Sequence, residues 1–327
     1  MRILLFLISC GHLFGTEPID VVFTWVDGSD PLWAAKKELY ERQQPDALFW
    51  GVRARRFRNR NELKYALRSV HSFAPFVRHI FIVTDNQRPS WLKDHPKVTL
   101  VFHKEIFLKK EYLPVFNSEA IEANLHRIPG LSERYVYCND DFFLGRKASP
   151  GDFFTKDGKM KFFEAFEQVP SGLRRAQEKD GYIRSAWNTS QALKRVYGDD
   201  KTQYFLRHAP YTMRKSVVKH AEKTFPTLFQ KNSASRFRSA DAYRIACCLI
   251  QYVGLYTDMA RPCTCDCYFF PFTDNRSSNS RHMEQLLERR PLFFCVQDEA
   301  DKAERETEKT LTRFFEAYFP VPAPWEL

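Results

Sequence analysis

Short apolar segments alternate with amphipathic segments through the first half of the chain. Residues 19–24 (IDVVFT) are mostly β-branched or aromatic and run toward the turn signal Asp-Gly-Ser-Asp, which predicts a strand. Residues 61–74 carry apolar side chains spaced i, i+3, i+4 and i+7, which form one face of a helix. The same reasoning predicts three more strands, at residues 79–84, 97–103 and 134–138, and two more helices, at residues 31–44 and 116–130.

The order of these elements predicts an α/β fold with a mostly parallel sheet flanked by helices. The second half of the chain is less regular. Strands are expected at residues 160–166 and 291–297, and helical patterns cover residues 185–198, 239–255 and 303–319. We expect these elements to pack on the same core, as an irregular and more helical second half of one domain.

Acidic residues follow the predicted strands of the first half. They are Asp27 and Asp30 after the first strand, Asp85 after the second, and Asp140 with Asp141 after residues 134–138. Ligands of α/β sheets bind beyond the carboxyl ends of the strands, so these acids mark one edge of the sheet as the candidate site. Two adjacent carboxylates are costly to desolvate, so either this turn lies in water or a cation binds there.

Asp298 ends a predicted strand of the second half and could join Asp140 and Asp141. Mg²⁺ and Mn²⁺ take hard oxygen ligands and commonly bridge carboxylates to the phosphates of a substrate. We therefore predict these three aspartates as metal ligands, in a site where a cation neutralises a diphosphate leaving group. The alternative is that all three are solvated turn residues.

The chain carries 50 Lys and Arg against 40 Asp and Glu, a formal charge of +10, which suits an anionic partner. Five arginines precede the predicted helix at residues 61–74, namely Arg53, Arg55, Arg56, Arg58 and Arg60. Guanidinium groups near a helix N-terminus suit phosphate, although a solvated basic loop is the alternative. Nucleic acid is disfavoured as a partner, because the acidic strand ends would repel its backbone.

Two further residues are candidates for chemistry. His208 precedes Ala-Pro, which places it on an extended or turn segment where it could act as a general base on a hydroxyl group. Arg238 lies just before a predicted helix and could bind a phosphate. The alternatives are a structural histidine and a surface arginine.

The chain has eight cysteines, seven of them outside the N-terminal leader, and this odd number fits no complete disulfide framework. Cys263, Cys265 and Cys267 alternate, a spacing that matches the usual zinc motifs poorly. A disulfide within this group remains open if the chain is exported. Cys247 and Cys248 lie in an apolar helical run and are expected to be packing residues.

Residues 1–16 predict a signal peptide or a short membrane anchor, because a basic residue precedes the apolar residues 3–8. The apolar stretch is shorter than the about 20 residues that span a bilayer. Leu7–Cys10 also fits a bacterial lipoprotein processing site. The leader predicts membrane association or export, or a place on the cytoplasmic face of the membrane if it is only an anchor. An N-terminal strand is the alternative.

Four separated blocks of this sequence together resemble a known family. They are residues 19–30, residues 61–92 with 113–146, residues 208–218 with 235–243, and residues 291–302 with 314–326. Their residues are similar to those of the Stealth family of sugar-phosphate transferases. That family includes bacterial capsular polysaccharide phosphotransferases and the catalytic subunit of the animal N-acetylglucosamine-1-phosphotransferase. The resemblance covers most of residues 19–326.

The resemblance implies an enzyme with a nucleotide-sugar-transferase core, GT-A or Rossmann-like. It implies transfer of a hexose or N-acetylhexosamine 1-phosphate from a nucleotide-diphosphate sugar such as UDP-GlcNAc, with Mg²⁺ or Mn²⁺, to a hydroxyl group of a glycan or polysaccharide. A phosphodiester forms and a nucleoside monophosphate leaves. It also implies one catalytic domain, residues 17–327, in which residues 17–150 bind the nucleotide sugar and residues 151–327 form the acceptor and catalytic half.

The resemblance assigns roles residue by residue. The implied catalytic residues are His208, Arg238, Asp141 and Asp298. The resemblance also places Asp30, Asn117 and Ser118 among the expected substrate ligands, and Asn139, Arg56 and Arg58 join them from the residue pattern itself. The expected metal ligands remain Asp140, Asp141 and Asp298. Two positions depart from the family pattern and put the identity of the substrate in doubt: Gln297 replaces a usual Asn, and Val115 replaces a common Thr.

Two alternatives to this function stay open at the level of sequence. The first is a metal-dependent glycosyltransferase, which would release a nucleoside diphosphate. The second is a basic module that binds glycans or nucleic acid without turnover, and it predicts a steep dependence of binding on salt.

Overall fold

The computed structural model describes residues 17–44, 49–172, 181–198, 201, 203–302 and 305–327. A five-stranded central sheet in the order β3-β2-β1-β4-β8 organises the first half of the chain. Four of its strands are parallel, and β8 pairs with β4 antiparallel. The strands are β1 (Ile19–Thr24), β2 (Val77–Thr84), β3 (Val98–Phe102), β4 (Arg134–Asn139) and β8 (Tyr211–Arg214). This arrangement confirms the predicted α/β fold with a mostly parallel sheet.

Two smaller sheets extend the central one. In the first, β11 pairs parallel with β10 and antiparallel with β5, and in the second, β6 pairs parallel with β9 and antiparallel with β7. Their strands are β5 (Phe142–Leu144), β10 (Cys267–Phe272), β11 (Phe293–Asp298), β6 (Met160–Gln168), β7 (Tyr204–Leu206) and β9 (Ala260–Cys263). Strand β5 follows β4 after two residues, so the turn between them connects the central sheet to β11.

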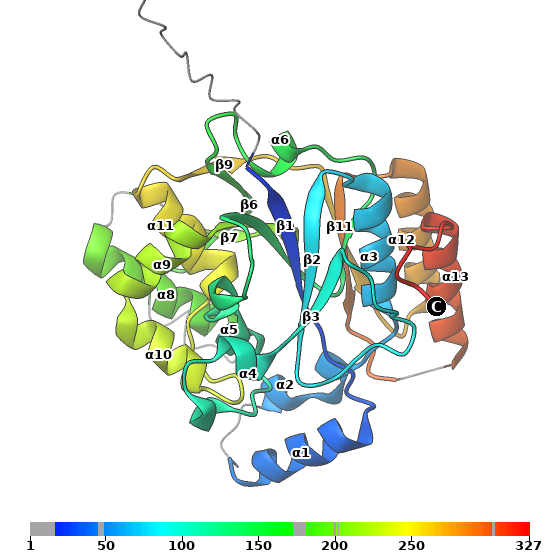
Figure 1. The fold of residues 1–327 in the computed structure, drawn as a ribbon, viewed down its shortest axis with the longest axis horizontal. Helices are drawn as coiled ribbons and strands as arrows, with labels where there is room; N and C mark the ends of the chain where they lie inside the picture. Colours follow the sequence, from blue (N-terminus) through cyan, green and yellow to red (C-terminus); the bar gives the residue numbers. More distant parts are fainter. Residues whose placement is uncertain (1–16, 45–48, 173–180, 199–200, 202, 303–304) are drawn as a thin grey trace, which may run out of the picture.

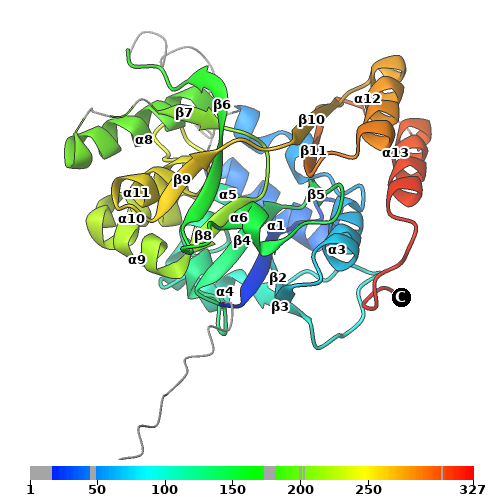
Figure 2. The ribbon, with the colours of Figure 1, turned by 90° about the horizontal axis from the view of Figure 1, so that it is seen from above.

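Helices cover both sides of the central sheet (Figure 1). Helix α3 lies on one side together with α12 and α13, and α8 to α11 gather on the other side, as the second view also shows (Figure 2). The helices of the first half are α1 (Pro31–Arg42), α2 (Phe49–Val52), α3 (Glu62–Phe73), α4 (His103–Ile106), α5 (Ser118–Glu122) and α6 (Pro150–Phe153). Those of the second half are α8 (Gly181–Tyr197), α9 (Lys215–Thr224), α10 (Pro226–Ala234), α11 (Ile250–Tyr256), α12 (Arg276–Arg289) and α13 (Arg305–Tyr318).

Two predicted helices are shorter than their patterns indicated. Residues 239–244 are not helical, because Asn188 of α8 donates to the carbonyls of Ala240 and Ala242, and a π-helical turn at Ile245–Leu249 then leads into α11. The helix expected at residues 116–130 stops at Glu122. The Asn124 side chain there donates to the carbonyl of Ala120, at 2.8 Å, and a short 3-10 turn follows at Leu125–Arg127.

One buried core includes residues of both halves of the chain, and two bidentate ion pairs link segments that are distant in sequence. Asp20 of β1 is fully buried and accepts from Arg78 of β2 at 2.8 and 2.6 Å. Arg68 of α3 donates to both carboxylate oxygens of Glu326, each at 2.7 Å, which holds residues 319–327 against α3. Both pairs are bidentate, and in the Arg68–Glu326 pair, where both side chains are buried, this geometry offsets the cost of burying two charges.

The predicted leader, residues 1–16, lies outside the described residues. Across the part of the chain that is described, no helix is both long and apolar enough to cross a bilayer.

Candidate active site

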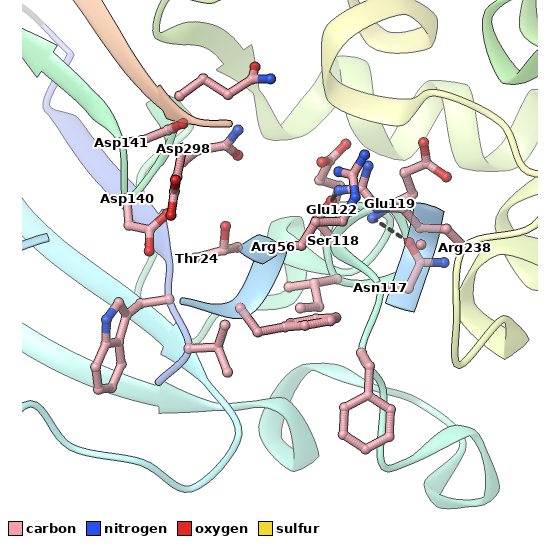
Figure 3. A pocket seen from close by; sticks show the side chains of 18 of the residues that line it. Thr24, Arg56, Asn117, Ser118, Glu119, Glu122, Asp140, Asp141, Arg238 and Asp298 are labelled. Atoms are coloured by element: carbon pink, nitrogen blue, oxygen red, sulfur yellow. Dashed lines mark hydrogen bonds between the residues drawn. The ribbon is translucent and has the colours of Figure 1, made fainter. Parts of the chain in front are cut away.

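A cavity of about 550 Å³ opens at the carboxyl ends of β1, β2, β3, β4 and β11. This is the edge of the sheet at which the sequence placed its acids. Ten of the eleven predicted site residues line the cavity, and Asp30 is the exception. In Figure 3, Asp140, Asp141 and Asp298 lie on one wall, and Glu119, Glu122 and Arg238 lie on the opposite wall.

The acidic wall is built by the turn between β4 and β5. The backbone N–H of Val296 on β11 donates to the carbonyl of Asp141, at 3.1 Å, so the end of β11 lies against this turn. Asp141 Oδ2 is 3.5 Å from the Cys295 thiol, and its buried Oδ1 has no hydrogen-bond partner. A buried carboxylate oxygen without a partner is costly, which indicates that a ligand completes this wall.

Glu62 joins the acidic wall and was missed by the sequence analysis. It is the first residue of α3, it is buried, and it lines the cavity. Burial, with Asp140 as the next cause, raises the pKa of Glu62 to about 8. Burial also raises the pKa of Asp140 to about 8, helped by Asp141, and raises the pKa of Asp141 to about 7. The sequence offered only the ordinary signal of an acid in the first turn of a helix.

Asp298 has partners that the sequence did not predict. Its Oδ2 accepts from Arg58 Nη1 and from Arg60 Nε, both at 3.1 Å, and its Oδ1 accepts from the backbone N–H of Ala300 at 3.0 Å. The predicted role of Asp298 as a third metal ligand stays a prediction, and its carboxylate is already shared between two arginines. Among the described residues, no group of three or more His, Cys, Asp or Glu side chains is arranged to hold a metal ion.

Asp140 and Asp141 nevertheless fit a divalent cation. Mg²⁺ is usually held by one or two carboxylates together with the phosphates of a substrate, so a complete protein cage is not required. The Asp141 Oδ1 atom without a hydrogen-bond partner, beside the half-buried Asp140, provides hard oxygen ligands for a cation. These two aspartates are the residues that would hold the ion.

Two residues at the start of α5 hold Arg238 on the opposite wall: Ser118, the first residue of the helix, and Asn117, its N-cap. Its Nη2 donates to Ser118 Oγ at 2.8 Å. Asn117 is almost fully buried, and its Nδ2 donates to the carbonyls of Ser235 and Phe237, at 3.1 and 3.4 Å. The predicted substrate ligands Asn117 and Ser118 therefore position Arg238, with both side chains at the cavity wall.

A second arginine on this wall was not predicted from the sequence. Arg244 lies with its guanidinium 3.9 Å from the ring centroid of Tyr182, and its Nε donates to Cys247 Sγ at 2.9 Å. Its Nη1 is 3.9 Å from Glu119, whose buried Oε2 has no hydrogen-bond partner. Burial, with Glu119 as the next cause, raises the pKa of Glu122 to about 7. This wall thus combines fixed guanidinium groups with carboxylates that can accept hydrogen bonds from hydroxyl groups.

His208 lies in the cavity wall between two aromatic rings. Its ring centroid is 5.0 Å from that of Phe269 and 6.4 Å from that of Phe142. Burial lowers the pKa of His208 to about 4, and the nearby Arg244 adds to this effect. The imidazole is therefore neutral at pH 7, which is the form that can accept a proton.

This low pKa predicts that the unfolding free energy depends on pH. Between pH 6.5 and about 4, the unfolded chain binds a proton at His208 that the folded chain does not, so stability falls as the pH falls. Compared with His208→Asn, we expect the unfolding free energy of the wild type to drop by about 2 kcal/mol between pH 7 and pH 4.5. Urea unfolding at both pH values measures this. The control is His220→Asn, which replaces an exposed histidine. If the wild type lost as much unfolding free energy relative to His220→Asn as relative to His208→Asn, the assignment to His208 would be contradicted.

The remaining predicted residues divide into two groups. Asn139 lines the cavity at the end of β4 and accepts from the Tyr137 hydroxyl at 2.9 Å. Asp30 does not line the cavity. Its Oδ1 accepts from the backbone N–H groups of Leu32 and Trp33, at 2.9 and 3.1 Å, so it caps α1. The structure thus shows a structural role for Asp30, as the N-cap of α1.

The arginine-rich segment, residues 53–60, contacts the acidic wall through hydrogen bonds from Arg58 and Arg60 to Asp298. Arg56 and Arg58 line the cavity, and the segment is held by a hydrogen bond from the N–H of Gly28 to the carbonyl of Phe57, at 2.8 Å. A Cβ on Gly28 would lie 2.4 Å from that carbonyl oxygen, closer than any real contact. A residue without a side chain is required here because two backbones meet.

Gly28→Ala should therefore displace the arginine-rich segment. We expect a loss of about 2–3 kcal/mol of unfolding free energy, which is typical of overpacking. We also expect weaker binding of a phosphate-bearing ligand in the cavity, because Arg56 and Arg58 would move. Thermal and urea unfolding measure the first effect. Gly151→Ala is the matched control, because its Cβ would only reach an ordinary contact of 3.6 Å with Ser149. Equal stability of the two variants would contradict this account.

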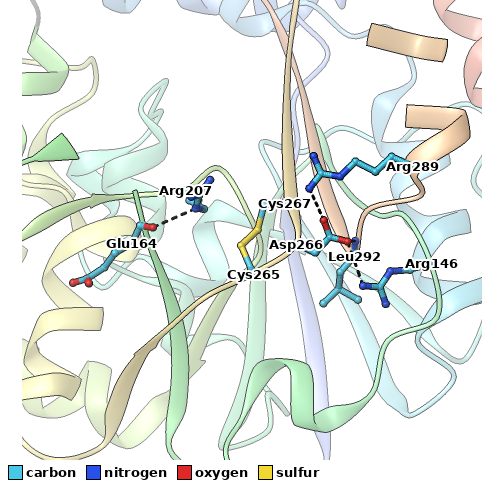
Figure 4. The surroundings of a disulfide bond; sticks show 8 residues. All are labelled: Arg146, Glu164, Arg207, Cys265, Asp266, Cys267, Arg289 and Leu292. Carbon is cyan, nitrogen blue, oxygen red and sulfur yellow. Dashed lines mark hydrogen bonds and ion pairs between the residues drawn. A yellow bond between two sulfur atoms is a disulfide. The ribbon is translucent and has the colours of Figure 1, made fainter. Parts of the chain in front are cut away.

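The alternating cysteines form one disulfide, between Cys265 and Cys267, and Cys263 is a free thiol. Asp266 lies between the bonded pair and accepts from Arg289 at 2.7 Å and from Arg146 at 3.3 Å (Figure 4). The bond therefore stands at the start of β10, where ion pairs from two other segments hold the chain.

Four family models match this chain in sequence order. They are described as conserved regions 1 to 4 of the Stealth protein and cover residues 17–44, 56–162, 207–255 and 284–327. Together they account for most of the chain, so this chain belongs to the Stealth family. The cavity lies between segments from all four regions.

Several curated proteins are similar to this chain over nearly its whole length. An exopolysaccharide phosphotransferase of Streptomyces coelicolor is 41% identical over 318 residues, which cover 94% of this chain and 52% of that protein. The exopolysaccharide phosphotransferase CpsY of Mycobacterium tuberculosis is 38% identical, covering 94% of this chain and 58% of the relative. The chain thus spans about half the length of the curated relatives it matches.

Solved structures resemble this fold only distantly. The galactosyltransferase LgtC, in complex with donor and acceptor sugar analogues, aligns with 94% of this chain and 98% of its own, at 12% identity and a TM-score of 0.44. The bifunctional glycosyltransferase WbbM aligns with 95% of this chain and 50% of its own, at 11% identity and a TM-score of 0.44. This likeness is too remote to indicate a shared chemistry.

Proposed function

We propose that this chain transfers a sugar 1-phosphate from a nucleotide-diphosphate sugar to a hydroxyl group of a glycan. One observation supports this most. A single cavity holds two adjacent, half-buried acids, Asp140 and Asp141, opposite Arg238, and Arg244 lies beside Glu119 on the same wall as Arg238. A diphosphate bound between these walls would meet guanidinium groups on one side and cation ligands on the other. Phosphoryl transfer depends mainly on such positioning and charge stabilisation.

In the proposed reaction, the acceptor hydroxyl attacks the phosphorus that carries the sugar. A new oxygen–phosphorus bond forms while the bond from this phosphorus to the bridging oxygen breaks, and the nucleoside monophosphate leaves with that oxygen. His208, neutral at pH 7, takes the hydroxyl proton. Arg238, held by Ser118, binds the phosphoryl oxygens together with Arg56 and Arg58 of the facing segment.

Asp140 and Asp141 would hold Mg²⁺ or Mn²⁺, which prefer carboxylate and phosphate oxygens as ligands. The ion, when bound, neutralises the charge on the diphosphate. Asp298 acts differently, because its carboxylate holds Arg58 and Arg60 against the acidic wall. In this proposal it is therefore a positioning residue.

The substrates are proposed from the printed names of the relatives and from the family resemblance. The donor is a nucleotide-diphosphate sugar of the UDP-GlcNAc type, and the acceptor is a hydroxyl group of a polysaccharide, since the relatives are named exopolysaccharide phosphotransferases. The enzyme acts at a membrane or in an exported compartment if the leader directs it there. It acts on the cytoplasmic face if the leader is only an anchor.

Product analysis tests the proposal. The full chain is incubated with UDP-GlcNAc, Mg²⁺ or Mn²⁺ and a panel of glycan acceptors, and the products are followed by phosphorus NMR. We expect a phosphodiester signal and release of uridine monophosphate. Release of uridine diphosphate, with no phosphodiester, would instead establish a glycosyltransferase. Binding without any turnover would leave a glycan-binding module.

A further inference from the structure

Phe269 is an aromatic side chain that the fold leaves uncovered inside the cavity. It lies on β10, lines the cavity and keeps 42% of its surface exposed. Phe270 and Phe272 on the same strand are buried in the core. Because side chains alternate along a strand, Phe269 points to the opposite face, toward the cavity. A phenyl ring that stays exposed to water does not contribute the favourable free energy of apolar burial. A ligand that covered the ring would gain this free energy on binding.

The ring of Phe269 is also in direct contact with His208. The two ring centroids are 5.0 Å apart and the planes are tilted by 47°. The other ring that contacts His208 belongs to Phe142, which is buried and cannot meet a ligand. Of the two aromatic neighbours of the imidazole, Phe269 is therefore the one that a substrate can reach.

We propose that Phe269 is the platform on which a sugar ring of the acceptor stacks. This inference rests on the proposed function, in which His208 takes the proton of the acceptor hydroxyl. That hydroxyl must lie within about 3 Å of the imidazole, so the sugar ring that carries it covers the surface next to His208. One face of a sugar ring presents C–H groups, and an aromatic face binds them by apolar contact and by attraction to its π-electrons.

The fold holds this platform rigidly. Strand β10 pairs with β11 in parallel register and places Phe269 beside Cys295. The next residue, Val296, donates its backbone N–H to the carbonyl of Asp141 in the turn between β4 and β5. The disulfide and the ion pairs of Asp266 fix the start of β10 (Figure 4). A side chain on a strand tied at its start and along its length is well placed to orient a ring, because little freedom is lost on binding.

The test compares three variants of the full chain. Phe269→Ala removes the ring, Phe269→Tyr keeps it, and Phe166→Ala removes a phenyl ring that is 93% exposed and does not line the cavity. Acceptors are the methyl α- and β-glycosides of glucose, galactose, mannose and N-acetylglucosamine, with UDP-GlcNAc as donor. Steady-state kinetics give KM for each substrate, and saturation-transfer NMR measures binding of the glycosides directly.

For Phe269→Ala, we expect the acceptor KM to rise about tenfold, while the donor KM stays within about twofold and the melting temperature is unchanged. Phe269→Tyr and Phe166→Ala should resemble the wild type. Saturation transfer to ring protons should be strong in the wild type and lost in Phe269→Ala, even where no turnover occurs.

Three results would overturn the assignment: an unchanged acceptor KM in Phe269→Ala, an equal rise in Phe166→Ala, or no saturation transfer from the wild type to any glycoside. The identity of the released nucleotide is read in the same assays. Release of uridine diphosphate would overturn the proposed phosphotransfer, while the acceptor KM of Phe269→Ala would still decide whether the platform exists.

Discussion

Asp141→Asn is expected to lower kcat by about a thousandfold while the protein stays folded. Asp141 is half-buried and its Oδ1 lacks a hydrogen-bond partner; desolvation raises its pKa, and the nearby Glu62 and Asp298 add to this effect. Asparagine has the same shape but carries no charge, so it relieves repulsion within the acidic wall. We therefore expect an unfolding free energy at pH 8 that equals or exceeds that of the wild type.

The measurement pairs initial rates with urea unfolding of the same preparations. Asp94→Asn is the matched control, because the Asp94 side chain is almost fully exposed and pairs with Arg88 at the surface. Activity of Asp141→Asn within about tenfold of the wild type would remove Asp141 from the catalytic machinery. A large loss of stability would show that its charge has a partner in the folded chain.

Asp298→Ala is expected to lower both stability and activity. Its carboxylate holds Arg58 and Arg60, and the Arg60 side chain is only 3% exposed. Removing one partner of a buried ion pair leaves the other charge without compensation, although Arg60 keeps its bond to Glu308. We expect a loss of about 2–4 kcal/mol in unfolding free energy and at least a hundredfold loss of kcat, about 3 kcal/mol, because Arg58 leaves the cavity wall.

Unfolding and rate measurements on Asp298→Ala separate this account from a metal-ligand role. Asp301→Ala serves as the control, since Asp301 lies on the same segment with an 81% exposed side chain and pairs with Arg55. If Asp298→Ala were as stable as the wild type and merely inactive, the ion pairs with Arg58 and Arg60 would not matter. Asp298 would then act directly on the substrate.

The contrast between these two aspartates shows what the sequence could and could not predict. The alternation of strand and helix patterns predicted the parallel sheet, and the strand that runs into two adjacent acids predicted the position of Asp140 and Asp141, because both follow from local pattern. The partners of Asp298 depend on arginines about 240 positions away in the chain. No local pattern carries that pairing, so it became visible only in the folded chain.

Glu62 and Arg244 were missed for a related reason. An acid in the first turn of a helix has an ordinary explanation in the helix dipole, and an arginine near an apolar helix has one as a surface residue. Both residues line the same cavity, which makes them candidates for the site. Their place in the cavity depends on tertiary packing and cannot be read from the local sequence. The capping role of Asp30, in contrast, could have been predicted, since an Asp directly before Pro31 is a typical start of a helix.

The most direct test of this account is uptake of Mn²⁺ measured by electron paramagnetic resonance. The central claim is that Asp140 and Asp141 bind a divalent cation together with the diphosphate of the donor. We predict that the signal of free Mn²⁺ falls when UDP-GlcNAc is added to the wild type or to Asp94→Asn, and that it persists with Asp141→Asn. Equal uptake by the wild type and Asp141→Asn, or no uptake by the wild type, would contradict the claim.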